Sequence, residues 1–442
     1  MNGKRRLKMK QLTRLFIPIC LETLFYMLSG MVDSLMLSAV GDYAVGAVGT
    51  ANSYIGIFII MFSIISSGMV SVMTQNIGAG RPGVAYQARQ LGLLFNAVAG
   101  VLMAAFLFSG AGAILRMVGI ADALYEPALI YLKIVGGGCI LNAVIPIFSS
   151  YLRAFGYTKQ PLYATIVGNI ANFVMNAVFL FVLHKGVAGV ATATVISKIL
   201  NLCIVLYFSH KLISAKNSTE RIANKTVLGQ IVKVGLPSAC ETALYNVAMM
   251  LVIRFLNQMD AEGLNVTARS YTATISNFSY CVGAALAQAN AIMTGWHIGA
   301  GELEECDRGT KRAAFVGVCV AVCMETAIVL GSGFIMPLFT DNPEMTALVR
   351  KLLAIDIVLE IGRVTNLVFG QALKTSGDAV FPAVIAAVFM FVFAVGGTWL
   401  FGISMGLMAV GAYIGLASDE CVRAVGMVWR WKTGKWRTKK LV

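Results

Sequence analysis

The stretch PICLETLFY at residues 18–26 returns as PSACETALY at residues 237–245, a shift of 219 positions. Both copies place a glutamate four positions after a proline and a tyrosine four positions after that glutamate. Two further motifs return in the same order, each shifted by 221 positions: IGAG at 77–80 as 298–301, and LRAFG at 152–156 as LKTSG at 373–377. A period of about 220 residues is far longer than a solenoid repeat. The chain therefore consists of two copies of one half.

The composition indicates a membrane protein. Hydrophobic residues make up 58% of the chain and charged residues 13%, whereas soluble domains carry about 25% charged residues. Apolar runs of about 18 or more residues recur, each long enough to cross a hydrocarbon core as a helix. We expect an all-α membrane protein with twelve transmembrane helices, six in each homologous lobe. The predicted spans are 15–40, 48–72, 88–113, 128–150, 160–183, 187–208, 234–257, 269–294, 312–335, 348–370, 380–401 and 405–429.

The domain organisation follows from the repeat. We expect an N-lobe over residues 1–209, a polar cytoplasmic linker over 210–233 and a C-lobe over 234–442 with a basic tail. The end of the linker is predicted to form an amphipathic helix that leads into Pro237. Because each copy has six spans, both copies start on the same side and are parallel repeats.

The formal charge of +14 is concentrated at the N-terminus, in the linker and at the C-terminus. With twelve spans these segments lie on one side, so the positive-inside rule predicts that both termini are cytoplasmic in the plasma (inner) membrane. This placement favours contact with anionic lipid over nucleic acid. We expect lipid contact to explain three tryptophans among the tail cations as well: Trp429, Trp431 and Trp436.

No motif for enzymatic chemistry is present. The sequence has no GxxxxGK[ST] phosphate-binding loop and no HExxH metal motif. The three histidines, His184, His210 and His297, are far apart, and the nine cysteines form no CxxC pair. We therefore expect no enzyme activity, no cofactor and no firmly assigned metal site.

Asp33 is the sharpest candidate for function. An ionisable residue inside a membrane costs about 2.5–3.5 kcal/mol on insertion scales, which makes it a functional candidate by default. Asp33 shares one helix face with Glu22, Tyr26 and Ser29, at spacings of 4, 3 and 4. The second copy has Val252 at this position. The difference favours a role for Asp33 in one lobe over a purely structural hydrogen bond.

The span over 160–183 carries amides on one face: Asn169, Asn172 and Asn176. Such side chains either join helices by hydrogen bonds or line a wet cavity. Thr192 and Thr194 of the next span are plausible neighbours. We predict a polar site shared with Asp33, and the bonding of helices is the alternative.

Glu22 and Glu241 each lie one turn after a proline. They either bind backbone groups that Pro18 and Pro237 leave without helical partners, or take part in transport.

A second cluster of charges lies in the span over 348–370. Asp356, Glu360 and Arg363 are spaced 4 and 3 and so share one helix face. A Glu–Arg pair neutralises itself, which allows both charges to be buried. The cluster is either a structural ion pair or a gate or coupling element.

These motifs together resemble the multidrug and toxic compound extrusion (MATE) family. The residues that carry the resemblance are the Pro18–Glu22 spacing with Val32-Asp33, the QNIGAG turn at 75–80, LRAFG at 152–156 with Pro161, the Asn-rich span and GVAGVATAT at 186–194. The ordered, duplicated set covers nearly the whole chain.

The resemblance implies two lobes of six helices around a central cleft. It implies export of organic cations and other polyaromatic drugs, driven by inward flow of sodium or protons. Asp33 matches the acid of the family's first span, Asn172 an amide beside it and Thr194 a hydroxyl of the sixth span. The implied partners are a small-molecule substrate and the lipid bilayer, and we expect a monomer.

Three departures from the family pattern bear on the coupling ion. Asn176, Tyr245 and Arg363 stand where many members, or the sodium-coupled branch, place acids. The departures favour a site centred on Asp33 in the N-lobe. A proton needs only one titratable group, so we expect proton coupling, and a sodium site at Asp33, Asn172 and Asn176 is the alternative.

A lipid-linked saccharide flippase of the same superfamily is the alternative function. Such a protein would favour a strongly cationic cleft for pyrophosphate, whereas the deep charges of this chain are mixed.

Overall fold

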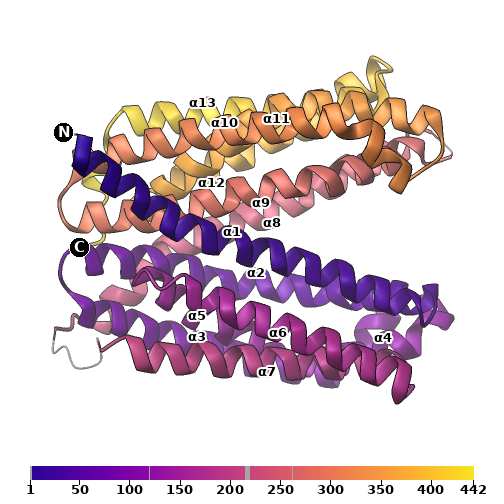
Figure 1. The fold of residues 1–442 in the computed structure, drawn as a ribbon, viewed down its shortest axis with the longest axis horizontal. Coiled ribbons are helices and arrows are strands. Elements are labelled where there is room, and N and C mark those ends of the chain that lie inside the picture. The colour runs from indigo at the N-terminus through magenta and orange to yellow at the C-terminus, as the bar shows by residue number, and fades with distance from the viewer. Residues whose placement is uncertain (1, 119, 215–219, 261) are drawn as a thin grey trace. The chain divides into compact units, whose positions relative to one another are not determined.

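The structure is a computed structural model that describes residues 2–118, 120–214, 220–260 and 262–442. The side chains of residues 2–9, 42 and 118 lie outside this description, among them those of the N-terminal cations Lys4, Arg5, Arg6 and Lys8. The linker cation Lys216 lies outside the described residues altogether. The described residues form thirteen α-helices and no strand (Figure 1). The all-α fold predicted from the sequence is confirmed.

The first copy of the repeat contains six helical spans. Two of them are compound: α4 and α5 meet at Gly138 with a bend of 42°, and α6 continues as the π-helical segment η1. The elements are α1 (Asn2–Ser38), α2 (Asp42–Gly78), α3 (Pro82–Val118), α4 (Asp122–Gly137), α5 (Cys139–Ala154), α6 (Lys159–Ala177), η1 (Val178–Val182) and α7 (Gly186–Leu212).

The second copy repeats this order with six further spans. Its fifth span begins as α12 and continues through two π-helical segments, η4 and η5. The elements are α8 (Asn224–Asn257), α9 (Leu264–Gly299), α10 (Leu303–Ile335), η3 (Met336–Leu338), α11 (Pro343–Ser376), α12 (Val380–Phe389), η4 (Met390–Val395), η5 (Thr398–Ser404), α13 (Met408–Lys432) and η6 (Lys435–Thr438).

Each of the twelve predicted spans coincides with a single helix or with one of the three compound spans, α4–α5, α6–η1 and α12–η4–η5. Within the described residues, eight helices are long and apolar enough to cross a membrane, or nine if the bent pair α4–α5 counts as one span. The spans that fall short are α9, α11 and α13, and these helices pack against one another. Their polar side chains line the C-lobe pocket described below, which explains the lower hydropathy.

The described helices form two compact units, for which we keep the names N-lobe and C-lobe. The N-lobe comprises Thr13–Gly235, and the C-lobe comprises Leu236–Val442 together with residues up to Leu12. The sequence predicts that the first twelve residues belong to the N-lobe, and the structure differs at this point. They belong to the C-lobe, because Leu12 packs against the C-lobe core cluster, which also contains Trp431 and Trp436.

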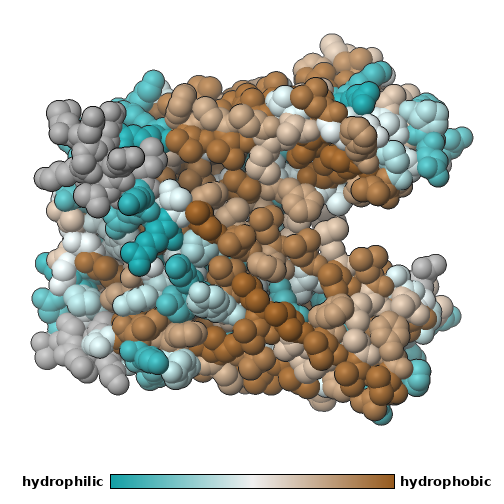
Figure 2. All heavy atoms as spheres, viewed as in Figure 1, coloured by the Kyte–Doolittle hydropathy of each residue, from teal (hydrophilic) through white to brown (hydrophobic). Residues whose placement is uncertain are grey.

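Apolar side chains dominate the middle of the helices, and polar side chains gather toward the helix ends (Figure 2). Many large apolar side chains are exposed, including Leu35, Phe315 and Leu330 at 70%, 70% and 78%. Such exposure is tolerated where lipid, rather than water, surrounds the helices.

The repeated glycine motifs form matching turns. Gly80 and Gly301 both have left-handed backbone angles, with φ of 76° and 75°, and each donates its N–H to a carbonyl three residues earlier. Gly156 and Gly377 behave in the same way, with φ of 85° and 96°. A side chain is unfavourable in this region, so the duplicated glycines preserve the turns between spans.

The C-terminal tail corrects the expectation of lipid contact for two tryptophans. Trp431 and Trp436 are each only 1% exposed and stack with ring centroids 4.2 Å apart. The indole N–H of Trp431 donates to Asp307 at 2.8 Å. Trp429 is 58% exposed. The sequence pattern could not reveal the stack, because Gly434 turns the chain back with a φ of 71° and buries Trp436 in the C-lobe core.

Candidate functional site

The N-lobe brings three predicted residues into one polar cluster. The amide of Asn176 on α6 donates to the Asp33 carboxylate on α1 at 2.8 Å and to the Asn172 carbonyl at 3.0 Å. Asn176 is fully buried and Asn172 is 5% exposed, while Asp33 is half-buried. The cluster thus links the first and fifth spans through one carboxylate and two amides.

Three other residues that the sequence singles out in the N-lobe, Thr194, Tyr26 and Asn169, form no hydrogen bond with this cluster in the part of the chain that the structure describes. The Thr194 hydroxyl donates to the Val190 carbonyl of its own helix at 2.9 Å and interacts with the hydroxyl of Tyr131 on α4. Tyr26 is 73% exposed. Asn169 donates to the backbone carbonyl of Phe25 at 2.8 Å and so joins α6 to α1.

Glu22 and Glu241 have side-chain partners rather than the backbone partners considered above. Arg153 donates to Glu22 at 2.5 Å in the N-lobe, and Lys374 lies 2.8 Å from Glu241 in the C-lobe. Arg153 and Lys374 occupy matching positions of the repeat. The Pro-x-x-x-Glu motif and the LRAFG/LKTSG motif of each lobe therefore form one ion pair, which explains why both motifs were kept in both copies.

Lys198 on α7 was missed by sequence reasoning. It lies one helical turn beyond Thr194, and its ammonium donates to the Asn142 side chain of α5 at 2.8 Å. It also interacts electrostatically with Asp33. The signal was present, because a lysine within the predicted span 187–208 meets the same criterion that identified Asp33.

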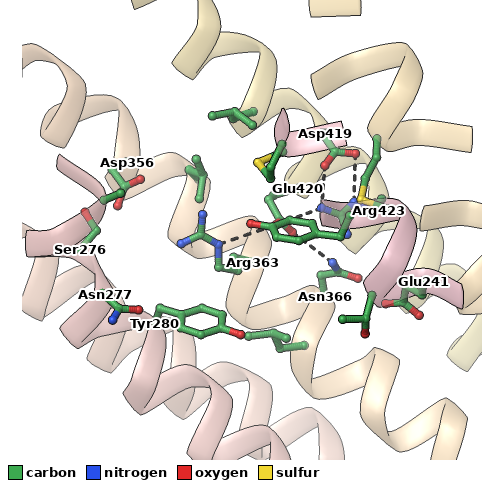
Figure 3. Close-up of a pocket in the computed structure, with 18 of the residues that line it drawn as sticks. Glu241, Ser276, Asn277, Tyr280, Asp356, Arg363, Asn366, Asp419, Glu420 and Arg423 are labelled. Atoms are coloured by element: carbon green, nitrogen blue, oxygen red, sulfur yellow. Dashed lines mark hydrogen bonds and ion pairs between the residues drawn. The ribbon is translucent and has the colours of Figure 1, made fainter. Parts of the chain in front are cut away.

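The C-lobe contains a polar pocket of about 490 Å³. Its charged lining comes mainly from α11 and α13 (Figure 3). Arg363 pairs with Glu360 one turn earlier and lies 3.7 Å from Glu420. Asp356 is 2% exposed and lies beside Ser276 of α9. The structure therefore brings Asp356, Glu360 and Arg363 together as their helical spacing predicted.

The contribution of α13 to this pocket was also missed. Arg423 binds Asp419 at 2.6 and 2.9 Å and Glu420 at 2.9 Å. Glu420 also accepts a hydrogen bond from Asn366 at 3.0 Å. These residues lie in the predicted span 405–429, where three charges in five positions were a visible signal. Tyr245 lines the same pocket.

Glu325 of α10 is a further buried acid near this cluster. It is fully buried, and its carboxyl group lies beside the Ser279 hydroxyl of α9. It interacts electrostatically with Asp356 and Glu360. Among the residues described, no three His, Cys, Asp or Glu side chains form a group that could hold a metal ion.

Comparison with known sequences confirms the resemblance noted above. The MatE family model matches residues 18–178 and 237–400, one match in each copy of the repeat. The uncharacterized transporter YisQ of Bacillus subtilis (strain 168) is 32% identical over 96% of this chain and 94% of its own length. A probable multidrug resistance protein, NorM of Thermotoga maritima, is 20% identical over 98% of this chain and 94% of its own length.

Solved structures share the fold. An outward-facing multidrug resistance MATE family transporter of the MOP superfamily has a TM-score of 0.83 at 21% identity, covering 97% of this chain and 96% of that chain. A MOP superfamily transporter from Pyrococcus furiosus, whose reverse binding-pocket polarity suggests a different function, has a TM-score of 0.82 at 20% identity, with 97% and 96% covered.

The two family matches cover most of the chain, and the shared fold consists of twelve spans in two six-helix lobes. The chain is a multi-pass membrane protein that belongs to the MATE family of transporters.

Proposed function

We propose that this protein is an antiporter that exports organic cations, drugs or other polyaromatic compounds in exchange for an inward-moving cation. The observation that carries the proposal is the Asp33 cluster, in which a deep carboxylate accepts a hydrogen bond from Asn176 within the N-lobe. The similarity to a probable multidrug resistance protein of Thermotoga maritima supports the substrate class.

Asp33 provides the chemistry that coupling requires. A proton that binds the carboxylate removes its negative charge, whereas an organic cation needs that charge for binding. Because the two states of Asp33 exclude one another, loading with a proton favours release of the substrate. Asn176, which is fully buried and hydrogen-bonded to Asn172, holds the carboxylate in place through this exchange.

We propose a proton rather than sodium as the coupling ion, because sodium prefers several oxygen ligands, some of them charged. The cluster offers one carboxylate, and Asn176 uses its amide nitrogen toward both of its partners. We further propose that the protein acts as a monomer in the plasma membrane with both termini cytoplasmic. Figure 1 and the packing of Leu12 against the C-lobe core cluster that contains Trp431 support termini on the same side.

Efflux of a cationic dye from proteoliposomes tests the proposal. A pH gradient, imposed with equal sodium on both sides, is expected to drive dye movement. A sodium gradient at equal pH is expected to have no effect. Transport that needs the sodium gradient and ignores the pH gradient would overturn proton coupling, and absence of dye movement under both gradients would overturn the antiporter proposal.

The flippase alternative is disfavoured by the C-lobe pocket. Arg363 and Arg423 each pair with carboxylates there. A pyrophosphate group would have to compete with these internal partners.

A further inference from the structure

The C-lobe pocket contains one cation and one anion that have no opposite charge in contact. Arg269 of α9 and Asp356 of α11 both line the cavity of about 490 Å³. Neither forms an ion pair with another described residue. The Arg269 guanidinium donates to the thioether sulfur of Met249 at 3.8 Å, and thioether sulfur is a weak acceptor. Asp356, only 2% exposed, lies beside Ser276 (Figure 3).

The other cations of this pocket are held by carboxylates of the C-lobe itself. Each of them contacts at least one carboxylate, in the ion pairs Arg363–Glu360, Arg423–Asp419, Arg423–Glu420 and Lys374–Glu241. A ligand would have to compete with these internal partners. At Arg269 and Asp356 it would meet no such competition, so these two side chains are the charges most available to a ligand.

The helix α9 indicates how far apart the two charges lie along the pocket. Its pocket-lining residues Arg269, Ala273, Ser276 and Tyr280 follow one helix face, at spacings of 4, 3 and 4. Ser276, the neighbour of Asp356, lies seven positions after Arg269. Seven helical residues rise by about 10 Å. The backbone positions that carry or adjoin the two charges are therefore about 10 Å apart along the helix axis.

Aromatic rings line the same pocket. Tyr245, Tyr280 and Tyr413 all contribute to its wall. Tyr245 and Tyr280 are 39% and 40% exposed, so their rings present free surface. Aromatic rings offer a large apolar area on which another ring can pack. The lining therefore suits a ligand that carries an aromatic group as well as charged ends.

We propose that the C-lobe pocket binds a short zwitterion, a molecule with one cationic and one anionic end, about as long as a tripeptide. The ammonium end contacts Asp356, and the carboxylate end contacts the guanidinium of Arg269. Contact with the ammonium supplies the opposite charge that keeps the Asp356 carboxylate ionised. An extended tripeptide spans about 10 Å, and the cavity volume is typical of a small-molecule site. This ligand class goes beyond the organic cations proposed above, and the site does not use Asp33.

Isothermal titration calorimetry of the full-length protein in detergent, at neutral pH, tests the proposal. The probes are the tripeptide Ala-Phe-Ala, its C-terminal amide, which lacks the anion, and its N-acetyl form, which lacks the cation. Wild type is expected to bind the zwitterion about tenfold or more tighter than either relative, because each relative loses a hydrogen bond to a charged group. Free phenylalanine is too short to reach both charges, so it should show no such advantage over its own amide and N-acetyl forms.

Two substitutions assign the two ends of the ligand. Arg269→Gln should bind the zwitterion and the amide equally, because the carboxylate has lost its partner. Asp356→Asn should bind the zwitterion and the N-acetyl form equally, because the ammonium has lost its partner. Each variant should keep the preference for the opposite end of the ligand, which a purely structural role of the residue would not produce.

Matched substitutions of exposed charges serve as controls. Arg254→Gln near the end of α8 and Asp341→Asn before α11 should keep the wild-type preference for the zwitterion. The comparison of wild type with Arg269→Gln decides the proposal even if the buried substitution Asp356→Asn prevents folding. Equal affinity of wild type for the three tripeptide forms, no binding of any of them, or an unchanged preference in folded Arg269→Gln would overturn the proposal.

The binding assay needs neither an ion gradient nor transport. Failure of dye efflux with the expected zwitterion preference would reject the proposed function alone. Efflux without that preference would reject the C-lobe site alone.

Discussion

The ion pair between Glu360 and Arg363 predicts a large loss of stability on mutation, and a larger loss when the arginine is replaced than when the glutamate is replaced. Glu360 is fully buried, and one of its oxygens has no hydrogen-bond partner within the described structure. Arg363→Met would leave this carboxylate without its cation. Because removing one partner of a buried ion pair leaves an uncompensated charge, we expect a loss of about 3–5 kcal/mol in the free energy of unfolding.

Glu360→Gln should cost less, because Arg363 still lies 3.7 Å from Glu420 and the new amide can accept a hydrogen bond. We expect a loss of about 1.5–3 kcal/mol, the range for a hydrogen bond to a charged group. The double variant removes both charges, so its loss should be smaller than the sum of the single losses by at least about 1 kcal/mol.

Unfolding of the detergent-solubilised protein with a denaturing detergent, followed by circular dichroism, measures these differences. The exposed pair Glu305 and Arg308 has the same three-residue spacing on α10, with side chains 37% and 58% exposed. Its double-mutant cycle should give a coupling of about 0.2–1 kcal/mol. Additive losses for Glu360 and Arg363, within the error of the control cycle, would refute their partnership.

Two further predictions concern stability. The first concerns the N-lobe ion pair: each of the single variants Glu22→Arg and Arg153→Glu should lower stability, and the double variant, which exchanges the two charges, should restore it. Thermal unfolding of the three variants measures these changes. Single variants as stable as wild type would contradict the pairing. The second concerns the tail: Trp431→Ala should destabilise the protein by about 3–5 kcal/mol, because it removes a buried, stacked ring. Trp429→Ala changes an exposed site and should alter stability by less than about 1 kcal/mol. Equal effects of the two variants in the unfolding assay would contradict the burial of Trp431.

The sequence predicted the fold well because its strongest signals are long and local. Twelve apolar runs and a duplicated set of motifs require only hydrophobicity, spacing and repetition to be read. The helix ends were less predictable, because helices such as α1 and α8 continue beyond the apolar stretch into polar segments. The folded-back tail was not predictable from hydropathy, because a buried stack of Trp431 on Trp436 depends on one turn at Gly434.

The candidate sites were predicted only in part. Helical spacing placed Asn172 and Asn176 on one face, and Asp356, Glu360 and Arg363 on another, since these relations are local. Ion pairs between different helices could not be predicted from the sequence. Arg153 and Glu22, for example, lie 131 positions apart, and no local pattern indicates that they form a pair. Lys198, by contrast, is a deep charge that the same reasoning should have identified.

Dye efflux by Asp33→Asn tests the central claim most directly. The variant keeps a side chain of the same shape but cannot exchange a proton, so proteoliposomes that contain it should show no efflux driven by a pH gradient. Its elution volume on size exclusion and its thermal unfolding should match those of wild type, which separates loss of coupling from loss of folding. Efflux at the wild-type rate by the folded Asp33→Asn protein would contradict the role of the N-lobe carboxylate.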